Sequence, residues 1–227
     1  MATIDRLWIV SNYNQDPSSV IARLDAPYLI CNQGDLVHVP KKYRNDSCFK
    51  QGKHSGHNIS DYLEYIINNY CNLPDSLGLA KGNIFPRHIS ENTFIKRQAL
   101  SGFVPLYSDT TTYRRQNHRV LPFQLVTQQV APGYLLEISN NWYIKHRKLG
   151  KHFPRLNDLF IHFFKRDPPR YIPFVPGGCM IVPASNIQRW PIETYQKLHE
   201  AVTYEFFPVE AFHVERSMLY FFSFPQE

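Results

Sequence analysis

The segment between residues 56 and 88 constrains the fold most, because it carries a helix pattern, a buried-strand pattern and a polar loop in that order. Apolar side chains recur at the spacing of one helix face over residues 59–70. Asn58 or Ser60 is suited to cap this helix, and a turn that contains proline ends it. Residues 77–80 then form a short apolar run, as in strands covered on both faces of a parallel sheet. The segment predicts a helix that returns the chain to a buried strand.

The same alternation extends over most of the chain. Apolar runs that predict strands are separated by helix patterns and by loops rich in Asn, Pro and Gly. This order indicates an α/β fold with a mainly parallel central sheet flanked by helices. The predicted strands cover residues 6–11, 28–31, 77–80, 121–127, 134–138, 172–175 and 179–182; the predicted helices cover 18–24, 59–70, 157–164, a stretch starting at 190–191, and 213–222; residues 40–55 are predicted to be mainly loop.

Length and composition favour one globular domain over residues 1–227. A chain of this length can bury a core, and 43% hydrophobic with 19% charged residues excludes a disordered protein. No apolar run approaches the roughly 20 residues that span a bilayer, and the first residues lack a secretory signal pattern. We therefore expect a cytoplasmic protein whose cysteines remain reduced thiols: Cys31, Cys48, Cys71 and Cys179.

The charge of the chain favours an anionic partner. The net charge is +6 and the isoelectric point is near 9.1, which suits a nucleotide, a nucleic acid or an acidic membrane surface. Basic residues gather in two stretches, 114–119 and 145–151. A solvated charged face explains such stretches equally well, so charge alone does not choose between these partners.

The polar loop after residues 77–80 is the first candidate site. In open α/β sheets, ligands bind beyond the carboxyl ends of the strands. Gly82 and Asn83 both tolerate positive φ and suit a loop whose backbone approaches a ligand. The dinucleotide, P-loop and zincin signatures are absent from the sequence. The loop offers these polar groups: Lys81, Gly82, Asn83, Arg87 and His88.

Several blocks of the sequence resemble one known family. In chain order they read SNYNQD, YLICNQG, GHNISDYLEYIINNYCNLPD, KGNIFPRH, PGGCMIVPASNIQRWPIETYQKL and VERSMLYFF. They are similar to a family of fungal and bacterial proteins catalogued as a domain of unknown function, which is itself similar to glycosyltransferases of the GT-A type. The resemblance covers residues 7–222 except the middle. It implies one Rossmann-like domain, with roughly residues 1–110 binding a nucleotide sugar and 111–227 receiving the acceptor.

The resemblance also implies roles for individual residues. Glu215 corresponds to an acidic residue that opens the last helix, where inverting GT-A enzymes place their general base. Without the resemblance, Glu215 reads as a first-turn carboxylate stabilised by the helix dipole, and the polar loop as ordinary surface residues. The implied groups are Asn12, Tyr13 and Asn14 for the base and ribose; Lys81, Gly82, Asn83, Arg87 and His88 for the diphosphate and sugar; and Gly177, Gly178 and His213 for the acceptor.

Departures from the family pattern leave metal use open. Asn58 stands where the family usually has an acidic residue, and Lys81 stands where it has glutamine. GT-A enzymes commonly hold Mn²⁺ or Mg²⁺ through an Asp-x-Asp motif, which this sequence lacks. Lys81, Arg87 and His88 are the alternative source of positive charge for the diphosphate. His54 and His57 form a His-x-x-His pair without the further ligands of a metal site.

Together these features predict a glycosyltransferase that moves a sugar from a nucleotide sugar, a UDP-sugar before others, to a glycan or glycoprotein acceptor. Peripheral contact with an anionic membrane is compatible with the charge. Two alternatives stay open. A nucleic-acid-binding protein or nuclease would use the basic stretches and the many aromatic residues, although no binding motif supports it. A non-catalytic carbohydrate-binding protein would bind sugar without nucleotide.

Overall fold

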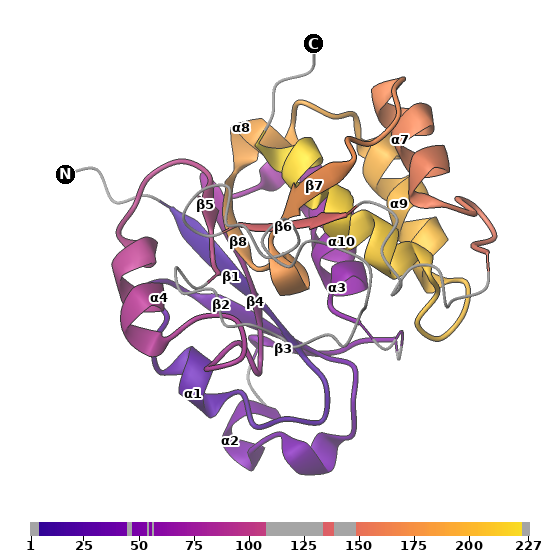
Figure 1. Ribbon diagram of the computed structural model, residues 1–227. Coiled ribbons are helices and arrows are strands. Elements are labelled where there is room, and N and C mark those ends of the chain that lie inside the picture. The colour runs from indigo at the N-terminus through magenta and orange to yellow at the C-terminus, as the bar shows by residue number, and fades with distance from the viewer. Residues whose placement is uncertain are drawn as a thin grey trace, which may run out of the picture.

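The chain forms an α/β fold around a six-stranded sheet with the order β3-β2-β1-β4-β8-β5, and β6 and β7 form a separate two-stranded sheet (Figure 1). The strands are β1 (Arg6–Asn12), β2 (Tyr28–Asn32), β3 (Phe49–Gln51), β4 (Ser76–Lys81), β5 (Val104–Pro105), β6 (Leu135–Ile138), β7 (Tyr171–Phe174) and β8 (Met180–Pro183). The computed structural model describes residues 5–44, 47–53, 55, 57–107, 134–138 and 149–223.

The main sheet is mixed but mostly parallel. β1 pairs in parallel with both β2 and β4, and β2 pairs in parallel with β3. β8 runs antiparallel to both of its neighbours, β4 and β5. The expectation of a mainly parallel sheet is therefore confirmed, with one reversed strand that comes from the C-terminal part of the chain.

Helices cover both faces of the sheet (Figure 1). On one face, Val20 and Phe94 from α1 and α4 pack against Trp8 and Val10 of β1. On the other face, apolar residues of α3, α7, α9 and α10 pack with Ile9, Leu77 and Leu79 into a larger core. The helices are α1 (Ser18–Ile21), η1 (Leu36–His38), α2 (Lys41–Arg44), α3 (Ile59–Asn69), η2 (Tyr70–Asn72), α4 (Glu91–Gln98), α7 (Leu156–Phe164), η3 (Pro176–Gly178), α8 (Ala184–Ile187), α9 (Ile192–Thr203) and α10 (Glu210–Phe222).

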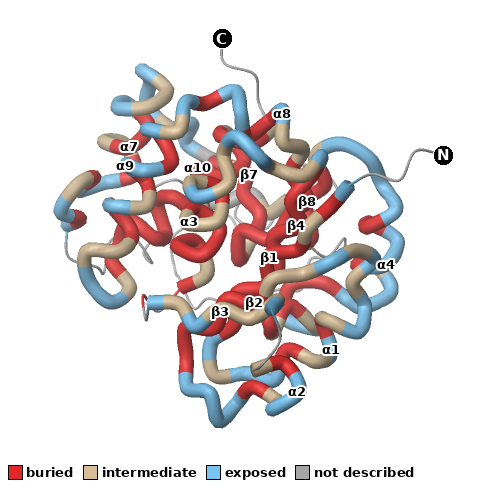
Figure 2. Tube along the Cα trace, turned by 180° about the vertical axis from the view of Figure 1, so that it is seen from behind, coloured by how far each residue is buried: buried red, intermediate tan, exposed pale blue. Residues whose placement is uncertain are grey.

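Alternation of side chains along β1 and β4 produces these two cores. Trp8 and Val10 point to one face, whereas Ile9 points to the other, as the period of two in a strand requires. Figure 2 shows the result, because most of β1, β4 and β8 is buried while pale blue exposed segments lie at the periphery. None of the helices in the described part of the chain combines the length and the apolar character that a bilayer crossing demands.

Gly78 gives a direct test of this packing. It lies opposite Trp8 in the β1–β4 ladder, and a β-carbon at Gly78 would fall inside the contact distance of the Trp8 ring. We expect Gly78→Ala to lower the free energy of unfolding by about 1–3 kcal/mol, because both residues lie in a filled core. Urea unfolding measures the change. Gly52→Ala is the matched control, because its β-carbon would make only ordinary contacts; equal losses in both variants would contradict the prediction.

The structure corrects several predicted boundaries. Residues 40–55 are not loop throughout, because they contain α2 and the edge strand β3. The last helix begins at Glu210, three residues before the predicted start, so Glu215 lies in its second turn and the first-turn carboxylate is Glu210. The predicted strand 121–127 lies outside the described residues, as do the basic stretch 114–119 and most of 145–151. All four cysteines are described, and none forms a disulfide.

Candidate functional site

The candidate site lies where β1 and β4 end side by side. Along the chain, the strand order first moves outward from β1 through β2 to β3, and then returns to β4 on the other side of β1. Such a reversal marks the place where α/β sheets bind ligands, beyond the carboxyl ends of the strands. Ser11 is aligned with Lys81 there, and the backbone N–H of Gly82 donates to the Ser11 carbonyl over 2.8 Å.

A chain of side-chain amides crosses the same edge from β1 to β3. Asn12 Nδ2 donates to Asn32 Oδ1 over 2.9 Å, and Asn32 Nδ2 donates to Gln51 Oε1 over 2.9 Å. Asn12 is completely buried and lies against Gly82, where a β-carbon would collide with it. Asn14 Oδ1 accepts from the Asp35 backbone N–H over 2.7 Å. Asn12 and Asn14 thus hold the loops after β1 and β2 together.

Gly177 is the point where predicted site residues from distant segments meet. A β-carbon on Gly177 would lie 3.0 Å from His88 Nε2 and 3.2 Å from Lys81 Cδ. The Gly177 backbone N–H donates to Glu215 Oε1 over 2.5 Å, and Asn58 Nδ2 donates to the Gly177 carbonyl over 2.6 Å. We call these five residues the Gly177 cluster. It brings a lysine, a histidine and a carboxylate to one turn beside the end of β4.

The backbone of the cluster requires glycine at its centre. Gly177 has a φ of +77°, in the region that residues with a β-carbon rarely adopt, and Lys81 and His88 occupy the space beside it. The side chain of Asn58 also serves the Gly177 turn. Asn58 stands at the N-terminus of α3 without capping that helix through its side chain, because its amide contacts Gly177 instead.

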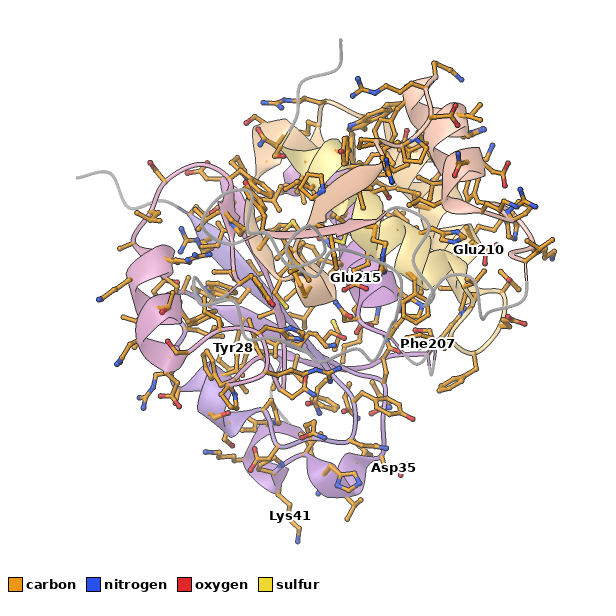
Figure 3. All side chains as sticks on the ribbon, viewed as in Figure 1. Tyr28, Asp35, Lys41, Phe207, Glu210 and Glu215 are labelled. Atoms are coloured by element: carbon orange, nitrogen blue, oxygen red, sulfur yellow. The ribbon has the colours of Figure 1, made fainter. Side chains whose placement is uncertain are left out.

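Glu215 reaches the cluster from the middle of α10. Its Oε2 lies 3.9 Å from Arg216 Nη1, while Oε1 accepts from Gly177. In the view of Figure 3, Glu215 lies nearer the sheet and Glu210, on the same helix, lies further out. The Cys179 thiol lies near both Lys81 and Glu215. Burial is the main reason that its pKa rises to about 12; the charge of Lys81 opposes this rise, and the charge of Glu215 adds to it. Both charges therefore lie close to the start of β8.

The remaining predicted residues are distributed differently. Gly178 is buried against Met218 and Ile59 and supports the turn by packing. His213 is completely buried on α10, and it lies about 200° around the helix from Glu215, so the structure does not bring it to the Gly177 cluster. Tyr13 and Arg87 are exposed, Asn83 is half-buried and Gly82 is buried beneath Asn12.

Asp61 is a candidate that the sequence reasoning missed. It lies in the first turn of α3, on the side opposite the apolar face, where a helix pattern predicts exposure. The structure buries it, because its carboxyl reaches the end of β1, where the Ser11 hydroxyl donates to Oδ2. Burial raises the pKa of Asp61 to about 7, against the opposing effect of hydrogen bonds from Ser11 and Gln33. Asp61 becomes a candidate only through its contact with the end of β1, and no local sequence pattern predicts that contact.

Of the His-x-x-His pair at residues 54 and 57, the structure describes only His57. His57 is buried, and its Nε2 lies 2.8 Å from the Val202 carbonyl, while His54 is outside the described residues. Burial lowers the pKa of His57 to about 4. Within the part of the chain that the structure describes, no group of three or more His, Cys, Asp or Glu side chains is placed to hold a metal ion.

Known proteins add no constraint to this geometry. Comparisons of the chain with protein-family models, with curated proteins and with solved structures found no match.

Proposed function

We propose that the chain is a glycosyltransferase that transfers a sugar from a nucleotide sugar to a glycan or glycoprotein. Among the nucleotide sugars, a UDP-sugar is the preferred donor. The observation that carries the proposal is the Gly177 cluster, in which Lys81, His88 and Glu215 meet at the reversal of strand order. The resemblance to GT-A enzymes assigns Lys81 and His88 to the diphosphate and Glu215 to the general base, although Glu215 lies in the second turn of α10 and not at its start. Ligand binding at such an edge is a general property of α/β sheets.

The chemistry of glycosyl transfer needs both charges of the cluster. The bond between the anomeric carbon and the diphosphate breaks, and the nucleoside diphosphate leaves with the electron pair. Lys81 and His88 are placed to stabilise the negative charge that develops on it. The acceptor hydroxyl attacks the anomeric carbon and gives its proton to the Glu215 carboxylate as general base. Oε1 of Glu215 is engaged by the Gly177 N–H, so Oε2 is the oxygen assigned to this proton.

The first test is binding of nucleotides, measured as a shift of the melting temperature. UDP, GDP, CMP and dTDP are each tested with and without Mn²⁺. We expect one nucleotide to raise the melting temperature by about 5 °C or more at roughly 100 times its Kd, because it binds only the folded state. The Lys81→Gln variant should lose most of this shift, because it removes the charge at the end of β4.

Lys96→Gln is the control, because Lys96 is an exposed lysine on α4. Its shift should equal that of the unmodified protein. A complete lack of stabilisation by all four nucleotides would refute the proposal. An equal shift in the Lys81→Gln variant would show that Lys81 does not contribute to donor binding. The donor site would then consist of the other residues of the cluster.

A further inference from the structure

An ordered projection after β2 exposes two neighbouring aliphatic side chains. It consists of η1 and α2, and we call residues 36–44 the η1–α2 tip. Leu36 is 45% exposed and Val37 is 75% exposed, whereas Val39 and Tyr43 are buried and pack with Ile30 of β2. The tip therefore has an inner apolar side that joins the core and an outer apolar side that meets solvent.

The backbone of the tip is held in place by its own hydrogen bonds. Val39 N donates to the Leu36 carbonyl over 2.9 Å, and Tyr43 N donates to the Pro40 carbonyl over 3.0 Å. Arg44 Nε donates to the Val39 carbonyl over 2.7 Å. The anchored side chains and these bonds fix the direction of the outer residues. The exposure of Leu36 and Val37 is thus a feature of the fold.

Basic side chains follow the exposed aliphatic pair along the chain. His38, Lys41 and Lys42 are exposed, and Arg44 is half-buried. Lys42 Nζ lies 4.7 Å from the centroid of the Tyr43 ring, so its stem lies on the tip. Among the described residues, Asp35 at the base of the tip and Asp16 near Lys42 are the acidic groups next to it, and Asp46, two positions after Arg44, lies outside the described residues. Figure 1 places α2 at one end of the molecule, and Figure 3 shows Lys41 extending from that end.

We propose that the η1–α2 tip docks the protein on an anionic membrane surface. Aliphatic side chains enter the headgroup region without a shaped partner, and each nearby lysine or arginine is attracted to acidic lipids. Two exposed aliphatic residues offer far less surface area than the roughly 800 Å² that each side of a stable protein interface buries. Single-stranded nucleic acid is bound through aromatic stacking platforms, and Leu36 and Val37 cannot provide one. The lipid surface is thus the partner that this combination fits.

Vesicle co-sedimentation tests the docking with the complete chain. The vesicles are pure phosphatidylcholine, or phosphatidylcholine with about 30% phosphatidylserine. We expect binding to the anionic vesicles only, and a loss of about tenfold or more in affinity for the Leu36→Ser/Val37→Ser variant. Lys41→Gln/Lys42→Gln should lose a similar factor, and about 0.5 M salt should weaken the binding of the unmodified protein. All four positions are exposed, so the variants should keep their melting temperature.

Ile161→Ser/Lys197→Gln is the matched control. Ile161 is an exposed aliphatic residue on α7 and Lys197 an exposed lysine on α9, at the other end of the molecule from α2 (Figure 1). This variant should bind the anionic vesicles like the unmodified protein. Absence of binding to anionic vesicles, equal binding to neutral ones, or undiminished binding of the Leu36→Ser/Val37→Ser variant would each overturn the proposal. None of these results depends on whether nucleotides bind at the Gly177 cluster.

Discussion

Replacing Glu215 with glutamine should reduce sugar transfer by about 100-fold or more while leaving donor binding intact, because a general base typically contributes a factor of this size. Glutamine keeps an oxygen that accepts from the Gly177 N–H, so the turn keeps its position. The rate is measured as release of nucleoside diphosphate from the sugar form of the nucleotide that stabilises the protein. Donor binding is measured separately, as the shift in melting temperature.

The glutamine variant separates catalysis from support of the turn. If Glu215 only holds Gly177, Glu215→Gln should retain nearly full activity and Glu215→Ala should lose it. If Glu215 is the base, both variants should be inactive and both should keep nucleotide binding in proportion to their folded fraction. Glu200→Gln changes an exposed carboxylate on α9 and should leave the rate unchanged. Retained activity in Glu215→Gln would show that Glu215 is not the general base.

Asp61→Asn should change how the stability of the protein depends on pH. The folded state holds the Asp61 proton up to a pKa of about 7, whereas the unfolded chain loses it near 3.8. The protonated carboxyl therefore contributes stability that is complete below pH 4 and is lost as pH rises through 7. At about 1.4 kcal/mol for each unit of pKa, the loss approaches about 4 kcal/mol. Asparagine stays neutral, so the variant should become more stable than the unmodified protein as pH rises.

The measurement is the difference in unfolding free energy between the two proteins, taken by urea titration from pH 4 to 8. A difference is needed because buried His57 and His213 act in the opposite direction: burial lowers the pKa of each to about 4, so they cost stability as pH falls from about 6.5. Both proteins share that effect. Glu200→Gln, which changes an exposed carboxyl on α9, is the control for replacing a carboxyl with an amide. A pH-independent difference for Asp61→Asn would show that the folded protein ionises Asp61 normally.

Much of the architecture was predictable because its elements are locally encoded. The strands near residues 6–12, 28–32 and 76–81 are short apolar runs bounded by turns, and α3 has an apolar stripe along one face. The edge strand β3 is three residues long and carries Lys50 at its centre, so it has no such pattern. The reversed direction of β8 is a property of long-range pairing with β4 and β5, and periodicity contains no information on strand direction.

The candidate site divides in the same way. Lys81 and His88 were predictable because they follow a strong strand, and the glycine pair marked the turn that they meet. Asn12 and Asn14 were predicted to contact the base and ribose from the loop after the first strand; in the structure Asn12 ends β1, and the contacts of both residues hold loops together. Asp61 lies on the polar side of its helix in sequence, and only the approach of β1 makes that side an interior. Contacts between segments that are distant in sequence decided what local patterns could not.

The insertion of β8 between β4 and β5 has a consequence for the order in which the chain can fold. β5 follows β4 after about twenty residues, yet it has no place in the sheet until residues 180–183 arrive between them. During synthesis, the edge of β4 therefore stays open while roughly a hundred further residues are made, and open strand edges invite pairing with other chains. We expect the sheet to close late and the protein to refold slowly. Fragments that end before residue 180 should aggregate, because their central strand lacks its partner.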